Sequence, residues 1–401
     1  MTQSQTLTPI EELKARKEKL QKHLAGQNTG GALILQNADL FYFSGTTQQC
    51  YLYIPVEGEC VLMARKDTER ARAESQLSQV VPISSPREIP GILEDHGLSM
   101  PETMGLELDV LPTNQYFSFQ RLFKPAELVD VSMAIRTIRA VKSDYEIGLI
   151  RKAAVMSDRL AAAVPNLLRE NITEVELSGL IEATARKWGH QGVTRMRLFG
   201  AELFYGHVMA GPTAAEPSYL SSPTGGAGLT PAVAQGASMR PIGRNEPILV
   251  DMVFALDGYL SDHTRIFCMG EPDESLAAAH NAMLDIQEAV KAAAVPGTTA
   301  GELYDMAVAK ARSSGMAEHF MGVGDNRIRF VGHGVGLEVD ELPVLARGQQ
   351  MPLEKNMVIA LEPKVIFPGK GVVGVENTHV VTKNGLEQLG TFREDIVVVD
   401  V

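Results

Sequence analysis

The sequence has few cysteines and no long apolar run, and both absences restrict the class of protein. Only Cys50, Cys60 and Cys268 occur in 401 residues. They show neither the spacing of metal ligands nor a disulfide framework, which suits a reducing cytoplasm. No run of about 18 apolar residues occurs, and the first residues, MTQSQTLTPIEELKARKEKLQKHL, are polar and charged. We therefore expect no membrane span and no signal peptide.

Positive charge is also scarce. The chain has 37 Lys and Arg residues against 49 Asp and Glu residues, and its net charge is −12. No basic stripe or nucleic-acid-binding motif offsets this charge, so nucleic acid is not an expected partner. With 45% hydrophobic and 21% charged residues, the composition is that of an ordinary globular protein long enough for two domains.

The first part of the chain alternates short β-branched or aromatic runs with charged stretches, which predicts an α/β domain. After an initial helix, the predicted strands are residues 32–35, 40–43, 51–55 and 61–64, and residues 67–77 are one of the charged stretches predicted to be helical. Ser143-Asp144-Tyr145-Glu146 has the pattern of a capping box that opens a long helix. We therefore predict a small α/β domain over residues 1–145 and a catalytic domain over residues 146–401.

The second part of the chain combines helices with hairpins, which predicts an α+β domain. Thr-x-x-Glu patterns at Thr173 and Thr299 indicate two further helix starts. Residues 274–294 form another predicted helix. Residues 212–243 are rich in Gly, Pro, Ser and Ala, and we expect them to form an irregular loop or bent strand that lines the functional site.

Four carboxylates in this part lie inside apolar, strand-like runs, and a histidine lies in a glycine-rich run. These residues are Asp251, Asp262, His333, Glu362 and Glu376. A buried ionised carboxylate is tolerated only when it is paired, hydrogen-bonded or bound to a cation. Taken singly, an aspartate here is better explained as a capping carboxylate or as the partner of an arginine such as Arg265, and the histidine as a packed, hydrogen-bonded residue. Their joint occurrence favours a metal centre.

The turns predict how the carboxylates face each other. Asp257-Gly258 is a favoured two-residue hairpin turn, and its register makes Asp251 and Asp262 diagonal neighbours about 7–8 Å apart. If residues 368–370 form the next turn, Glu362 lies opposite Glu376. Two glutamates ~5 Å apart repel by roughly 3 kcal/mol at an effective dielectric of 20. A cation between the carboxylates would remove this repulsion.

The charge count favours two divalent ions. Two such ions cancel four carboxylate charges, and together they lower the pKa of a bridging water towards neutrality. Ligation by oxygen atoms and one imidazole suits Mn, Co, Fe or Zn, and the sequence does not choose among them.

At these residues the chain resembles the pita-bread metallopeptidases, family M24, which include Xaa-Pro aminopeptidase, prolidase, methionine aminopeptidase and creatinase. The resemblance is carried by the stretches VDMVFALDGYLSDHTRIF, GHGVGLEVDELP, IALEP and VENTHVV. It extends over nearly the whole chain, because the residues before about 145 resemble the amino-terminal domain of the prolidase and creatinase branch. It implies a pita-bread catalytic domain after that α/β domain, and a homodimer.

The resemblance also implies a role for each ligand. Asp251 would hold one metal, His333 and Glu362 the other, and Asp262 and Glu376 both. Glu362 would also pass a proton from the metal-bound water to the leaving nitrogen. The implied enzyme is a dinuclear hydrolase that uses a metal-bridged hydroxide to cleave the amino-terminal residue from short Xaa-Pro peptides.

Three departures from the family pattern affect the groups that hold the substrate. No histidine occurs between His207 and His263, Asp340 stands where a second histidine is usual, and Gly374 stands where an arginine is common. Loss of one such donor costs a factor of about 10² in rate. His207 is a candidate replacement or an ordinary packed histidine. Asp340 is a candidate to bind a substrate ammonium group or orient a ligand, or else a partner of Arg347.

Two other functions stay open at this point. The altered substrate groups favour a hydrolase or lyase that acts on a small non-peptide metabolite, as in the creatinase branch. Creatinase itself works without metal, however, whereas this chain keeps all five ligands. A binding module without catalysis is the other alternative, and the intact ligands argue against it.

Overall fold

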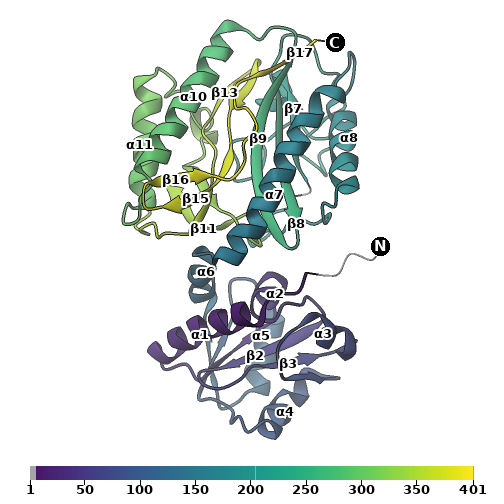
Figure 1. Cartoon of the computed structure of the whole chain (residues 1–401), viewed down its shortest axis with the longest axis vertical. Helices are drawn as coiled ribbons and strands as arrows, with labels where there is room; N and C mark the ends of the chain where they lie inside the picture. The colour runs from purple at the N-terminus through teal and green to yellow at the C-terminus, as the bar shows by residue number, and fades with distance from the viewer. Residues whose placement is uncertain (1–5, 204, 401) are drawn as a thin grey trace. The chain divides into compact units, whose positions relative to one another are not determined.

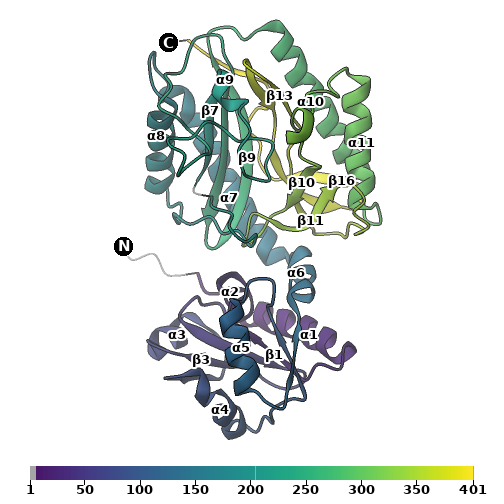
Figure 2. The same cartoon turned by 180° about the vertical axis from the view of Figure 1, so that it is seen from behind.

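The computed structural model describes residues 6–203 and 205–400. Contacts within the chain divide it into two compact units, Met1–Arg139 and Ala140–Val401. Both units are drawn from opposite sides in Figures 1 and 2. In the described part of the chain, no helix is long and apolar enough to cross a membrane.

The first unit is built on one six-stranded sheet with the order β4-β3-β2-β1-β5-β6. Figure 1 shows α1 over one face of the sheet, and Figure 2 shows α5 over the other. The strands are β1 (Gly31–Ile34), β2 (Cys50–Pro55), β3 (Val61–Ala64), β4 (Val80–Pro82), β5 (Thr103–Leu106) and β6 (Glu127–Asp130). The helices are α1 (Ile10–Gly26), α2 (Asn37–Ser44), α3 (Thr68–Glu74), α4 (Ile89–Asp95), α5 (Thr113–Leu122) and α6 (Ser132–Ala140).

One predicted strand of this unit is wrong. Residues 40–43 form part of helix α2, which is closed at both ends. The side chain of Gln36 accepts a hydrogen bond from the backbone N–H of Asp39 at the start, and Gly45 has the left-handed conformation at the end, with φ of 79°. These two caps satisfy backbone N–H and C=O groups at the helix ends that have no partner within the helix. They favour a helix over a strand for this short apolar run.

The second unit contains sheets with the strand orders β11-β10-β12-β15-β16, β17-β9-β8-β7 and β13-β14. Its strands are β7 (Gly206–Ala210), β8 (Ile248–Leu256), β9 (Tyr259–Met269), β10 (Phe330–Gly334), β11 (Glu341–Ala346), β12 (Val358–Leu361), β13 (Lys364–Phe367), β14 (Gly371–Gly374), β15 (Asn377–Thr382), β16 (Gly385–Gln388) and β17 (Val397–Val399). Its helices are α7 (Asp144–Ala163), α8 (Glu174–Lys187), α9 (Gly211–Ala214), α10 (Glu274–Ala293) and α11 (Ala300–Ser313).

The predicted helix starts of this unit are confirmed. Ser143 and Glu146 form a complete capping box at α7, and Thr299 and Glu302 form one at α11. The side chain of Thr173 accepts from the N–H of Glu176 at α8. Each cap satisfies backbone donors that the first helical turn leaves unpaired.

Two helix pairs cover the sheets of the second unit, as Figure 1 shows. Apolar side chains of α10 and α11 pack with those of β10, β12, β13 and β14 in one core. Side chains of α7 and α8 pack with those of β7, β8, β9 and β17 in a second core. The strands that carry the predicted ligands are therefore held by two separate helix-on-sheet cores.

The predicted hairpin registers are also confirmed. Leu256 pairs with Tyr259 across the Asp257-Gly258 turn, and both turn residues have positive φ, as this turn type requires. In the second hairpin, Phe367 pairs with Gly371, and the same register continues from β13–β14 into β12–β15. Both long strands of that hairpin are interrupted, and the interruptions contain Glu362 and Glu376.

Candidate metal centre

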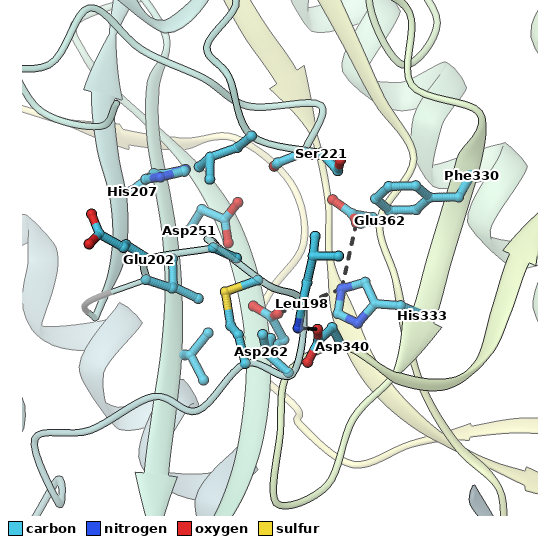
Figure 3. A pocket seen from close by; sticks show the side chains of 18 of the residues that line it. Leu198, Glu202, His207, Ser221, Asp251, Asp262, Phe330, His333, Asp340 and Glu362 are labelled. Carbon is cyan, nitrogen blue, oxygen red and sulfur yellow. Dashed lines mark hydrogen bonds and ion pairs between the residues drawn. The ribbon is translucent and has the colours of Figure 1, made fainter. Parts of the chain in front are cut away.

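The five predicted ligands come from three strands and from the two interruptions of the second hairpin, and they line one cavity of about 310 Å³. Asp251 lies on β8, Asp262 on β9 and His333 on β10. Glu362 and Glu376 lie where the strands of the second hairpin are interrupted. Figure 3 shows Asp251, Asp262, His333 and Glu362 around this cavity. The structure therefore brings together residues that are up to 125 positions apart, from Asp251 to Glu376.

His333 faces three of the carboxylates. Its Nε2 atom is 3.8 Å from Asp262 Oδ2, 3.7 Å from Glu362 Oε1 and 3.9 Å from Glu376 Oε1. These distances are too long for hydrogen bonds. They approach the separation of about 3.4 Å between two ligands of a tetrahedral ion with bonds of about 2.1 Å. The donor atoms are therefore spaced to share a small cation.

The tautomer of His333 also suits metal binding. Its Nδ1 atom lies 3.2 Å from the carbonyl oxygen of Gly334. A carbonyl oxygen only accepts hydrogen bonds, so Nδ1 carries the proton and donates it. In the neutral ring, the lone pair is then on Nε2, the atom that faces the carboxylates.

A third kind of group lies at this centre, the ammonium of Lys364, which was not among the residues predicted from the sequence. Its Nζ atom is 3.2 Å from Asp251 Oδ2, 2.8 Å from Glu362 Oε2 and 2.7 Å from Glu376 Oε2. The Lys364 side chain is fully buried. The signal in the sequence was a lysine in an apolar strand, two residues after Glu362, where period-two alternation puts both side chains on one face.

Lys364 lies opposite the position where the family commonly has arginine. Gly374 is its cross-strand partner, with φ of 152°. A Cβ atom at Gly374 would lie 2.4 Å from the carbonyl oxygen of Pro363 and 2.7 Å from the Cα atom of Lys364. Position 374 therefore does not admit a larger residue, and the cation comes from the facing strand.

Comparison with known proteins assigns the family. Residues 148–383 match the model of metallopeptidase family M24, and residues 16–141 match that of the creatinase/prolidase N-terminal domain. The chain belongs to metallopeptidase family M24. Membership of M24 implies a divalent metal cofactor, and the donor atoms around His333 fit one.

Relatives and solved structures agree with this assignment. An Xaa-Pro dipeptidase from Pyrococcus furiosus is 28% identical over 389 residues, which cover 96% of this chain and 100% of the relative. An Xaa-Pro dipeptidase from Lactobacillus delbrueckii is 30% identical over 68% of this chain and 66% of its own length. The crystal structure of the prolidase from Pyrococcus horikoshii is 25% identical, with a TM-score of 0.80 over 96% of this chain and 100% of that one. The predicted pita-bread fold is therefore confirmed.

Neutral donors hold the carboxylates of this M24 centre. Thr264 Oγ1 donates to Glu376 Oε2 at 2.8 Å, and the backbone N–H of His263 donates to Asp262 Oδ1 at 3.0 Å. Such outer hydrogen bonds fix the direction of a ligand. They leave Asp262 Oδ2 and Glu376 Oε1 directed towards His333.

Arg265 does not provide the ion pair that was the alternative explanation for the aspartates. Its guanidinium donates to the backbone carbonyls of Thr264 and Glu376 and to the side chain of Asn377. It therefore fixes the backbone beside the centre, while the aspartate carboxylates remain directed into the cavity.

Burial and mutual repulsion raise the pKa of the carboxylates. Burial first, and then the charge of Asp251, raise the pKa of Asp262 to about 7. Burial and Asp262 raise the pKa of Glu376 well above its usual range. For Lys364, burial lowers the pKa, but the attraction of Asp251, Glu362 and Glu376 outweighs burial and raises it. A cation that enters this centre must therefore displace protons.

His207 lies beside Asp251 and lines the same cavity (Figure 3). Its Nδ1 atom is 3.3 Å from Thr224 Oγ1, and its Nε2 atom is 3.1 Å from Gln235 Oε1. Burial lowers its pKa, so the ring is neutral near pH 7. His207 therefore lines the cavity, and both of its ring nitrogens contact polar side chains.

Asp340 also lines the cavity, but its carboxylate is engaged. Its two oxygens accept from the backbone N–H groups of Arg197 and Leu198 at 2.8 and 2.7 Å. The carboxylate oxygens of Asp340 thus bind the backbone at Arg197 and Leu198. The alternative partner, the side chain of Arg347, does not take this place.

The remaining walls of the cavity are largely apolar. They include Leu198, Phe199, Leu220 and Phe330. The irregular segment predicted over residues 212–243 supplies Tyr219 to Ser222 to this wall, as expected. A small apolar group can therefore lie next to the carboxylates.

Proposed function

We propose that this chain is a divalent-metal-dependent peptidase that removes the amino-terminal residue from short Xaa-Pro peptides. The observation that carries the proposal is the set of donor atoms around His333 at the base of an apolar cavity in an M24 fold. Relatives that match over most of the chain are named Xaa-Pro dipeptidases. The same comparisons do not favour the alternative of a small non-peptide substrate.

The proposed ligands are the five residues predicted from the sequence: Asp251, Asp262, His333, Glu362 and Glu376. A bound divalent ion lowers the pKa of a coordinated water and polarises a carbonyl group. Oxygen donors with one imidazole suit Mn, Co, Zn or Fe. The count of two ions remains a prediction from the four carboxylate charges, and the buried ammonium of Lys364 adds one positive charge beside them.

Glu362 is the proposed proton carrier. Its Oε1 atom is on the side of His333, and its Oε2 atom accepts from Lys364 at 2.8 Å. The carboxylate form of Glu362 is the form that can take a proton from the attacking water. Glu362 then returns this proton to the leaving nitrogen.

The cavity suits a short peptide. Its volume of about 310 Å³ and its apolar walls match a site that surrounds a small ligand. Leu198, Leu220 and Phe330 offer an apolar surface to a prolyl ring. We propose that Asp340 positions the segment at Leu198, and that His207, which lines the cavity beside Asp251, takes the place of the missing family histidine.

The test is an assay of the purified chain with added Mn, Co, Zn or Fe. Xaa-Pro dipeptides and tripeptides are compared with Xaa-Ala peptides of equal length. We expect turnover of the proline peptides, and a loss of at least about 10² in kcat in Glu362→Gln, whose side chain accepts no proton. Absence of turnover with every metal would reject the peptidase.

A homodimer and a cytoplasmic location remain predictions. The three cysteines are free and buried, which suits a reducing compartment. Light scattering on the purified chain distinguishes a monomer of 43.5 kDa from a species of twice that mass.

A further inference from the structure

We infer that the ammonium of Lys364 occupies one of the two cation positions of the centre, so that the chain holds a single divalent ion on the His333 side. The inference rests on the proposed metal ligands and concerns how many ions they hold. It lowers the expected number of divalent ions from two, the number that four carboxylate charges suggest, to one.

Two glutamates each direct one carboxylate oxygen towards His333 and the other towards Lys364. Glu362 and Glu376 each direct Oε1 towards His333 Nε2, at 3.7 and 3.9 Å. They each direct Oε2 towards Lys364 Nζ, at 2.8 and 2.7 Å. The same two carboxylates thus connect a lysine ammonium with the donor cluster around His333.

Of the five ligands proposed above, Asp251 belongs to the lysine side, and the inference removes it from the residues that hold the single ion. Its Oδ2 atom is 3.2 Å from Lys364 Nζ and 3.4 Å from Thr224 Oγ1. Asp262, in contrast, directs Oδ2 towards His333 at 3.8 Å. The cluster of possible metal ligands within 4.8 Å of one another consists of Asp262, His333 and Glu376, and it includes neither Asp251 nor Glu362.

A divalent ion between Asp251 and Glu376 would compete with Lys364 for the same oxygens. The ammonium already lies within hydrogen-bond distance of both residues. Two positive charges this close repel strongly in a buried site. One divalent ion and one ammonium therefore avoid a conflict that two divalent ions and an ammonium would create.

The chain also holds Lys364 in place. Its side chain is fully buried, and its backbone carbonyl accepts from the N–H of Met321 at 2.9 Å. A Cβ atom at Gly374 would lie 2.9 Å from the Cγ atom of Lys364. The lysine stem thus runs through the space that a side chain at position 374 would need.

The test measures metal content and not activity. The full chain is stripped of metal, loaded with Mn(II) and dialysed, and bound Mn is counted by elemental analysis and by isothermal titration. We expect one Mn per wild-type chain, with the electron paramagnetic resonance signal of an isolated ion. Lys364→Met frees the second position, and we expect two Mn per chain with a spin-coupled signal.

Three further variants make the result specific. Lys370→Met removes an exposed ammonium from the turn of the same hairpin, and it should still bind one Mn. Asp251→Asn should bind one Mn with an affinity within tenfold of wild type, whereas Glu376→Gln should lose at least a hundredfold.

The outcomes separate the two proposals. Two spin-coupled Mn ions in the wild-type chain overturn the inference and leave the peptidase proposal intact. Absence of any tight Mn, Co, Zn or Fe site rejects the metal centre itself. If Lys364→Met does not fold, the number of Mn ions bound by the wild-type chain and the Mn affinity of Asp251→Asn still test the inference.

Discussion

Single residues show how the centre keeps several buried charges in fixed directions. Glu376 receives hydrogen bonds at Oε2 from Thr264 and Lys364, which leaves Oε1 directed towards His333. Asp262 is held at Oδ1 by the backbone N–H of His263. Each of these two carboxylates thus has one oxygen fixed by the protein and the other available to a cation.

Thr264→Val tests this arrangement, because valine keeps the shape and removes the donor. We expect metal affinity to fall by about 10-fold to 100-fold, the usual loss when an outer hydrogen bond to a ligand is removed. Competition with a chelator measures it. Thr382→Val, which removes a hydroxyl that donates to the carbonyl of Gly385 at 2.7 Å, is the control. Equal affinities in the two variants would contradict the role of Thr264.

Asp262 predicts a pH dependence of the metal-free chain. Its pKa rises from 3.8 to about 7 because burial and Asp251 disfavour the charge. The folded chain therefore holds this proton between pH 4 and 7 while the unfolded chain releases it, and the contribution of Asp262 to stability falls as pH rises through this range.

Asp262→Asn resembles the protonated form at every pH. The melting temperature of the metal-free variant, relative to wild type, should therefore increase from pH 4 to pH 7 and then level off. Differential scanning fluorimetry across this range measures the difference. A constant difference would show that the folded pKa of Asp262 is not raised.

At the scale of elements, the interrupted hairpin is the feature that forms the centre. β12 and β13 are separated at Glu362 and Pro363, and β14 and β15 are separated at Val375 and Glu376. The continuous register on both sides keeps the two glutamates opposite each other. The interruptions remove them from the regular ladder, and their carboxylates contact Lys364 and face His333.

Gly374→Ala tests this hairpin. The left-handed region and the contact with Pro363 leave no space for a Cβ atom, so we expect a loss of about 1–3 kcal/mol or more in the free energy of unfolding. Gly179→Ala in helix α8 is the control, since nothing lies within 4 Å of its Cβ position. It should gain up to about 1 kcal/mol. Urea unfolding measures both, and equal effects would contradict the strain at Gly374.

The sequence predicted most elements but not all of them. Capping boxes and turn residues are local signals, and they gave α7, α11 and both hairpins. The apolar run of residues 40–43 carries no period that separates a buried strand from a buried helix. Whether this run forms a helix or a strand depends on the caps at Gln36 and Gly45. Neither cap residue belongs to the pattern of apolar residues.

At the scale of the whole molecule, all five proposed ligands belong to the unit Ala140–Val401. A ligand stabilises only the part of a chain that must be folded to bind it. The chain has two compact units, and such chains often unfold in more than one step.

Calorimetry should therefore show two unfolding transitions. Added metal should raise the midpoint temperature of one of them and leave the other unchanged. At a metal concentration about 100 times Kd, binding adds about 2.7 kcal/mol. For a unit of this size, that corresponds to roughly 5–10 °C. A chelator should reverse the shift, and His333→Ala should not show it. A single transition that moves as a whole would mean that the two units unfold together.

The sequence by itself determined which five residues line the cavity of the centre and which residues pair across each turn. A strand alternates with period two and a short turn fixes the register, so local spacing is enough to place Asp262 beside Asp251 and Glu376 opposite Glu362. Only the tertiary structure decided which cation these carboxylates meet. Lys364 reaches Asp251 across 113 residues, and that contact depends on how the two sheets pack, which no local pattern encodes.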